Sequence, residues 1–151
     1  MVMNSKVTST LALVAAAGGF FLAAVRAQAP PSRTVWDGVY TEEQANRGRT
    51  VYDERCAACH GPALEGVEMA PALTGSQFLS TWSGQSVGDL FERTRTTMPQ
   101  DDPGSLSQRV NADVMAYLLL ANNFPPGKVA LPRQTMILNQ IVIEAKKPEQ
   151  E

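Results

Sequence analysis

The sequence predicts an all-α fold, and two observations support this prediction. Apolar residues recur at helical spacing in several stretches, and each stretch begins near a residue typical of a helix N-cap. No stretch alternates apolar and polar side chains over the length of a strand. Glycines and prolines are frequent between the periodic stretches, so we expect short helices joined by irregular loops.

The first 29 residues have the three parts of a secretory signal peptide. A lysine lies near the start, residues 11–25 form an uncharged apolar run, and small residues follow that suit a cleavage site. The cut is expected after Ala27 or Ala29, and Ala27 is favoured because Pro30 would directly follow the second site. The apolar run also approaches the length of a membrane span, so an uncleaved anchor is the alternative. We expect an exported, periplasmic protein.

The charge of the mature chain limits its partners. Loss of Lys6 and Arg26 with the signal peptide would leave 11 of the 13 basic residues against 15 acidic ones, a net charge of about −4. An acidic protein is poorly suited to bind nucleic acid, whose phosphates require basic surface. It is equally unsuited to an electrostatic hold on anionic lipid. We therefore expect no nucleic-acid partner, and membrane attachment only through an uncleaved signal peptide.

The folded part is expected to begin with an extended, irregular segment over residues 30–40. Thr41 followed by Gln44 is a capping-box signature, which predicts a helix that runs to about Ala57. Gly48 lies on the apolar face of this helix. A glycine inside a helix costs about 1 kcal/mol. Its presence therefore indicates that another helix approaches closely at this point.

The motif that ends this helix carries the predicted chemistry. Cys56 and Cys59 are the only cysteines of the chain, and His60, its only histidine, follows directly. C-x-x-C-H is the attachment pattern of c-type haem, because the two thiols can each add to a vinyl group of one porphyrin while the histidine binds its iron. Structural zinc would need four ligands, and a thioredoxin-like thiol pair would follow a strand. We expect one covalent haem c, with zinc and a redox-active thiol pair as the alternatives.

Three further helices are expected after a loop over residues 61–72. They span residues 75–82, 86–96 and 107–122, and Ser86 and Ser107 begin the last two. The middle helix is expected to end near Thr96, because a residue before a proline avoids helical angles and Pro99 follows. The predicted domain covers residues 41–124. In the extension over residues 125–151, apolar residues between 131 and 143 are expected to lie along the domain, and the end is expected to be partly disordered.

Haem iron needs a second axial ligand or keeps an open site. With no second histidine, methionine sulfur is the remaining soft ligand. Met69 lies nine residues from His60, too few to reach the opposite haem face, Met115 lies within a helix, and Met136 lies in the extension. Met98 lies 38 residues after His60 in a loop stiffened by prolines. We therefore expect Met98 to be the sixth ligand.

With these motifs the chain resembles the small bacterial mono-haem cytochromes c of class I, whose iron is ligated by histidine and methionine. The resemblance covers about residues 41–123 and rests on Gly48-x-x-x-Tyr52-x-x-x-Cys56-x-x-Cys59-His60-Gly61, Pro71-x-Leu73, Thr97-Met98-Pro99 and Ala116-Tyr117. The C-x-x-C-H motif is specific, and the other motifs gain weight from their order. The resemblance implies the cytochrome c fold, in which the first and last helices cross and short helices and loops wrap one covalent haem. Gly48 and Tyr52 would meet Tyr117 at the crossing.

The resemblance also implies roles for single residues. The Pro71 carbonyl would accept the second ring N–H of His60, which orients the ligand. Leu73 would pack on the haem, and Trp82 and Arg95 would contact its propionates. Haem attachment in this family takes place on the outer side of the cytoplasmic membrane, in agreement with the predicted export.

The expected function is one-electron transport. His60 and Met98 would close both faces of the iron, so no catalytic residue is expected and the protein is expected not to be an enzyme. Similar domains accompany quinoprotein dehydrogenases that carry pyrroloquinoline quinone, which implies such a donor and a terminal oxidase or another cytochrome as acceptor. Two alternatives stay open. One is a haem sensor or haem enzyme with an open or labile sixth site. The other is a subunit held permanently in a dehydrogenase complex, docked through the segments at both ends.

Overall fold

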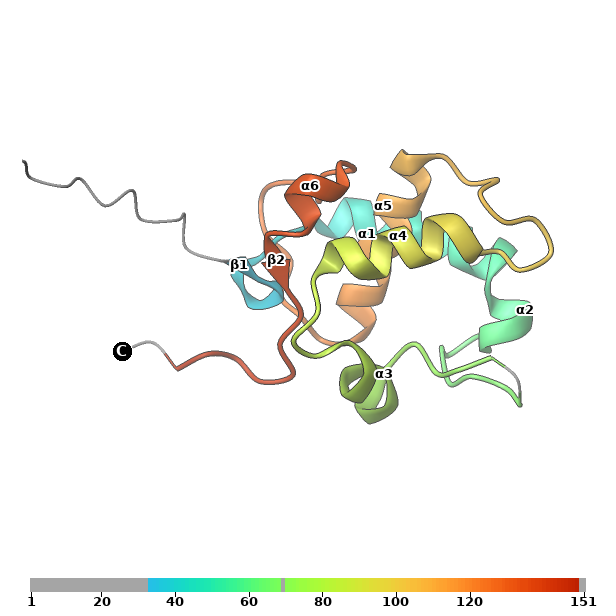
Figure 1. The fold of residues 1–151 in the computed structure, drawn as a ribbon, viewed down its shortest axis with the longest axis horizontal. Coiled ribbons are helices and arrows are strands. Elements are labelled where there is room, and N and C mark those ends of the chain that lie inside the picture. Colours follow the sequence, from blue (N-terminus) through green and yellow to red (C-terminus); the bar gives the residue numbers. More distant parts are fainter. Residues whose placement is uncertain (1–32, 69, 150–151) are drawn as a thin grey trace, which may run out of the picture. The chain divides into compact units, whose positions relative to one another are not determined.

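The computed structural model describes residues 33–68 and 70–149, and the statements below refer to these residues (Figure 1). The predicted signal peptide and Met69 lie outside them. The elements follow in the order β1 (Arg33–Thr34), η1 (Val35–Asp37), α1 (Glu42–Arg55), α2 (Ala57–His60), α3 (Gly75–Trp82), α4 (Val87–Thr97), α5 (Gln108–Ala121), α6 (Thr135–Leu138) and β2 (Ile141–Val142). None of these helices is long and apolar enough to span a membrane.

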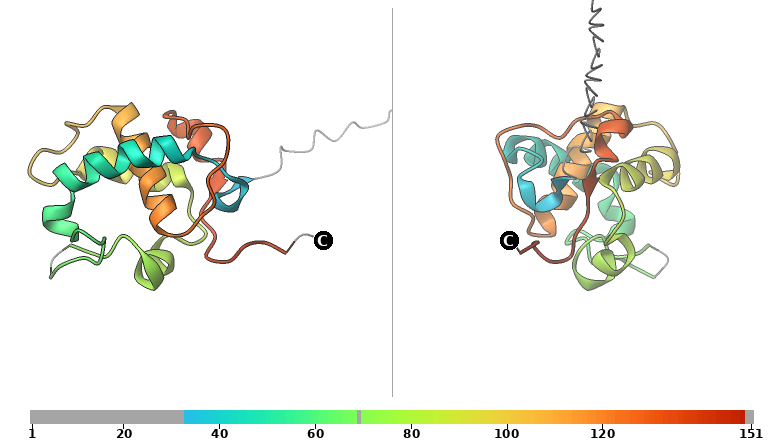
Figure 2. Two further views of the ribbon diagram at one scale, coloured as in Figure 1. Left: turned by 180° about the vertical axis from the view of Figure 1, so that it is seen from behind. Right: turned by 60° about the vertical axis from the view of Figure 1, so that its left-hand side comes forward.

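The crossing of α1 and α5 forms the centre of the fold (Figure 2). A Cβ atom at Gly48 would lie only 1.8 Å from the carbonyl oxygen of Asp113, so only glycine allows the two backbones to come this close. The rings of Tyr52 and Tyr117 pack beside the crossing, with centroids 5.4 Å apart. The close approach predicted at Gly48 and the contact of Tyr52 with Tyr117 are both confirmed.

Local capping starts the helices where the sequence indicates. The hydroxyl of Thr41 accepts a bond from Gln44 N at 3.2 Å. Ser86 and Asp89 form a complete capping box, with bonds of 3.0 Å and 2.9 Å between each side chain and the other's backbone N–H. Ser107 caps α5 through Val110 N at 3.3 Å. Each bond joins residues three apart, so the sequence alone predicts it.

The first helix ends earlier than expected. Cys56 has φ −125° and ψ −34°, which breaks the helix after Arg55, and the short helix α2 carries the chain on through His60. The expectation of one continuous helix to about Ala57 was therefore wrong. The break lies at the first cysteine of the motif and separates α1 from the turn of α2 that contains Cys59 and His60, and no propensity of the flanking residues predicts it.

The segment before α1 is not the irregular segment that was expected. Thr34 and Asp37 form a capping box around η1, in which Thr34 N donates to the Asp37 carboxylate at 2.6 Å. Val35, Val39 and Tyr40 are buried in the core. The threonine followed three residues later by an aspartate is the local signal of this helical turn. The burial of this segment depends on residues far along the chain.

Those residues lie in the C-terminal extension, which continues the core. Its apolar residues lie along the domain as expected, and the most buried are Leu131, Leu138, Ile141 and Ile143. Residues 145–149 are exposed and have no regular structure. β2 pairs in parallel with β1, with Arg33 opposite Ile141, and this two-residue ladder leaves the fold class all-α.

Polar contacts tie the extension to the N-terminal half. The buried side chain of Gln44 accepts from Leu131 N at 2.6 Å and donates to Leu131 O at 3.1 Å. It therefore does not return to the Thr41 backbone, as a complete capping box would require. The hydroxyl of Tyr40 donates to Phe124 O at 2.5 Å, and the rings of Trp36 and Phe124 form a T-shaped pair with centroids 5.0 Å apart. The domain therefore needs its end segments to complete its core.

Candidate haem site

The three residues of the motif lie at the end of α1 and in α2. Cys56 is half-buried, Cys59 is exposed, and both are free thiols. His60 ends α2 and is 8% exposed. Burial raises the pKa of the Cys56 thiol to about 11. A redox-active thiol pair would need a lowered thiol pKa instead, so this environment speaks against a thioredoxin-like role.

The ring of His60 is held in one orientation. Its Nδ1 lies 2.8 Å from Pro71 O, the contact that the resemblance implies. A carbonyl can only accept, so the proton of the neutral ring lies on Nδ1 and the lone pair lies on Nε2. This is the state in which an imidazole can bind a metal, and the carbonyl fixes the ring plane.

The loop after the motif is held together by backbone hydrogen bonds. Gly66 N donates to His60 O at 2.8 Å, and Leu73 N donates to Leu64 O at 2.9 Å. The hydroxyl of Tyr52 donates to Gly61 O at 2.6 Å and holds the first residue of the loop. Sequence reasoning assigned Tyr52 to the helix crossing and missed this second contact, because a nine-residue separation does not reveal a bond across a loop.

An open cavity of about 390 Å³ adjoins the second thiol. Its lining is Ala58, Cys59, Val67, Glu68, Ala70 and Gln100. Haem c requires two thiols and an imidazole nitrogen, and Cys56, Cys59 and His60 Nε2 supply them next to this cavity wall in sequence, so these residues fit the cofactor. No three Cys, His, Asp or Glu side chains of the described ranges gather as a metal site. A second cavity, between α1, α5 and residues 130–134, contains none of the predicted haem-site residues.

The methionines differ in their surroundings. Met98 caps the end of α4, is half-buried, and its N–H donates to Thr94 O at 2.9 Å. Gln100, two residues later, lines the cavity beside Cys59. Met115 is fully buried inside α5, and Met136 on α6 is 78% exposed. Among the described methionines, Met98 is therefore the one whose loop borders the candidate site.

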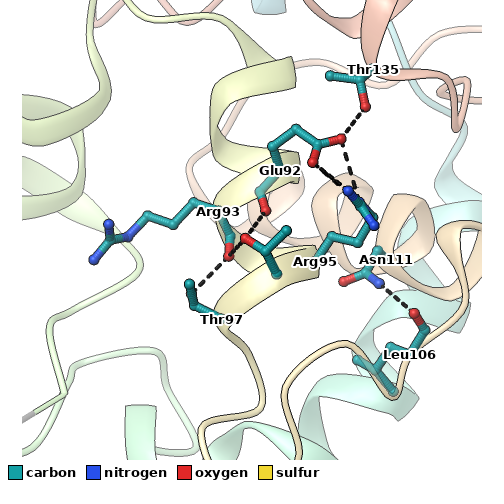
Figure 3. A network of polar contacts seen from close by, with 8 residues as sticks. Glu92, Arg93, Arg95, Thr97, Leu106, Asn111 and Thr135 are labelled. Atoms are coloured by element: carbon teal, nitrogen blue, oxygen red, sulfur yellow. Dashed lines mark hydrogen bonds and ion pairs between the residues drawn. The ribbon is translucent and has the colours of Figure 1, made fainter.

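The remaining predicted contacts have mixed outcomes. Leu73 and Trp82 are partly buried and pack against the core. The guanidinium of Arg95 binds Glu92 at 2.6 Å and 3.2 Å, and Glu92 also accepts a bond from Thr135 (Figure 3). The bond from Arg95 comes first and that from Thr135 second in holding the pKa of Glu92 below its ordinary value. Arg95 thus pairs with an acid three residues away, and this structure gives no support to its expected propionate contact.

Comparison with known proteins adds a family. The family model described as cytochrome c oxidase, cbb3-type, subunit III matches residues 43–118. The matched range contains every motif of the site and neither end segment. A similar solved structure is that of the sulfane dehydrogenase SoxCD from Paracoccus pantotrophus, with 20% identity over 80% of this chain and 68% of that chain and a TM-score of 0.49. The search of curated proteins finds no match.

Proposed function

Because this chain belongs to the family of cytochrome c oxidase, cbb3-type, subunit III, and is therefore a small mono-haem c-type electron-transfer protein, we propose that it is an exported one-electron carrier. Its donor would be of the dehydrogenase type and its acceptor a respiratory protein. One observation carries the proposal. Two free thiols lie within five residues of a histidine whose Nδ1 is held by the Pro71 carbonyl, and the second thiol, Cys59, lines an open cavity.

Each residue of the motif has a defined part in this function. Cys56 and Cys59 would hold the haem covalently, and His60 would supply the proximal ligand through Nε2. Bound there, haem c supplies one iron that gains or loses one electron. The Pro71 carbonyl holds the His60 ring so that it need not reorient when the charge of the site changes.

Met98 is the proposed sixth ligand. Its loop borders the cavity, whereas Met115 is enclosed in α5 and Met136 is exposed on α6. A thioether ligand favours reduced iron and raises the reduction potential. If His60 and Met98 both held the iron, a substrate would have no place to coordinate, which favours a carrier over a haem enzyme.

The proposed location is the periplasm, and the predicted signal peptide supports it. We propose a quinoprotein dehydrogenase as donor and a terminal oxidase or another cytochrome as acceptor. The name of the family includes an oxidase, which is in line with such an acceptor. Val67, 49% exposed on the wall of the cavity, offers an apolar contact for a transient partner beside the haem site.

The test is an absorption spectrum of exported, haem-loaded protein. Oxidised wild type is expected to show the weak long-wavelength band of sulfur-ligated ferric haem, and Met98→Ala is expected to lose it. Met136→Ala is the matched control, because that methionine is exposed and lies outside the cavity lining. Met69→Ala is expected to keep the band as well.

Two outcomes would contradict the proposal. A wild type that lacks the band and binds carbon monoxide readily in the reduced form has an open or labile sixth site. A haem sensor or haem enzyme would then be the better hypothesis. A band lost in Met69→Ala and kept in Met98→Ala would show that the ligand was misassigned. Recovery of the mature chain from the periplasm, with its N-terminus sequenced, tests export and the cut after Ala27 or Ala29.

A further inference from the structure

One buried side chain connects the end of α5 to the loop that carries Pro71. Asn122 is 8% exposed, and backbone groups use both ends of its amide. Its Nδ2 donates to Leu73 O at 3.0 Å and to Leu118 O at 2.9 Å, while its Oδ1 accepts from Gly75 N at 3.1 Å. An asparagine at the end of a helix usually serves only that helix. This one also holds backbone groups 47 and 49 residues away.

The segment held by Asn122 is the one that orients His60. Only Ala72 separates Leu73 from Pro71, whose carbonyl binds the His60 ring at 2.8 Å. Apart from the bridge between Val67 and Ala70, residues 61–68 and 70–74 have no regular structure. Its position therefore depends on tertiary bonds rather than on a helix or sheet ladder.

These contacts form a closed series that runs from the motif through both helices and back to His60. The motif is attached to α1, α1 is locked to α5 by the close approach at Gly48, and α5 ends at Asn122. From Asn122 this series of contacts returns through Leu73 and the Pro71 carbonyl to His60. The distance between the carbonyl and the imidazole thus depends on two packed helices as well as on the loop's own backbone bonds.

We propose that Asn122 is a positioning residue for the haem site, which holds the Pro71 carbonyl against His60 Nδ1. The proposal rests on the haem ligation by His60 proposed above. Asn122→Ala removes the amide. Asn122→Asp keeps the shape of the side chain and an acceptor for Gly75 N–H, and removes the donor to Leu73 O. It also removes the donor to Leu118 O, so the Asp variant separates the loss of the amide N–H groups from the loss of the whole side chain.

The experiment follows hydrogen exchange of the His60 Nδ1 proton by NMR in the reduced, haem-loaded protein, together with the reduction potential. Both Asn122 variants are expected to exchange roughly tenfold faster than wild type, because a hydrogen bond of ordinary strength is lost, and to show a changed potential. The control is Tyr40→Phe. This variant removes a buried hydrogen bond to the carbonyl of Phe124, which lies two residues after Asn122, and leaves the bonds between Asn122 and the haem loop in place. It is expected to lower stability and leave the exchange rate and the potential unchanged.

Wild-type exchange and potential in Asn122→Asp would overturn the positioning role. An equal change in Tyr40→Phe would overturn it too, because the effect would then follow general stability. A wild type that carries no covalent haem would overturn the proposed function itself, and this inference with it. Faster exchange and a changed potential in the Asn122 variants alone would establish the role.

Discussion

Replacing Gly48 by alanine tests the packing that joins the haem motif to the last helix. The new Cβ would lie 1.8 Å from Asp113 O, 2.4 Å from Asp113 C and 2.9 Å from Val114 N. All three are backbone atoms of α5, so no side chain can rotate away. Because Cβ contacts under 3.0 Å are essentially never seen, the two helices must separate by about 1 Å at their closest point.

The size of the effect follows from two opposing terms. Overpacking in a core costs about 1–3 kcal/mol, and a clash with backbone belongs at the upper end, about 3 kcal/mol. Alanine in place of glycine inside a helix returns about 1 kcal/mol. The net loss in the free energy of unfolding is about 2 kcal/mol, which lowers the melting temperature of a domain of this size by roughly 8 °C.

The assay is thermal unfolding of haem-loaded protein, followed by far-ultraviolet circular dichroism. Thr50→Ala is the control, since Thr50 is exposed on the same helix and its hydroxyl bonds only to Asn46 O of that helix. That variant is expected to stay within about 0.5 kcal/mol of wild type. If Gly48→Ala melts at or above the wild-type temperature, the crossing is looser than described and the reasoning fails.

Two further predictions concern the contacts that hold the end segments and α4. Gln44→Ala leaves the buried N–H and C=O of Leu131 without their partner and is expected to lower the free energy of unfolding by about 3 kcal/mol, measured by urea denaturation. An unchanged urea midpoint would contradict the role given to the Gln44–Leu131 bonds. The pKa of Glu92 is held below its ordinary 4.5 by Arg95 and then Thr135, so its stabilising effect is full above pH 4.5 and is lost as the pH falls through the lower, folded value. Glu92→Gln should therefore flatten the fall in melting temperature below pH 4.5, and a slope equal to that of wild type would refute this.

Features that depend on neighbours within one helical turn could be predicted from the amino-acid sequence. The caps at Thr41, Ser86 and Ser107 each involve a residue three positions on, so the helix starts follow from local chemistry. The spacing of Cys56, Cys59 and His60 identified the candidate haem site in the same way. Gly48 predicted the close approach of another helix, but the sequence did not show that this helix would present the backbone of Asp113.

Contacts between distant residues could not be predicted in this way. Gln44 has the right spacing for a capping box, yet its side chain binds Leu131, 87 residues away, because that pair satisfies buried backbone groups. Glu92 accepts a bond from Thr135, 43 residues away, and Asn122 reaches the Pro71 loop across the fold. The physical reason is the range of the forces. Caps and periodicity act within a turn or two, whereas the partner of a buried polar group depends on which segments packing brings together.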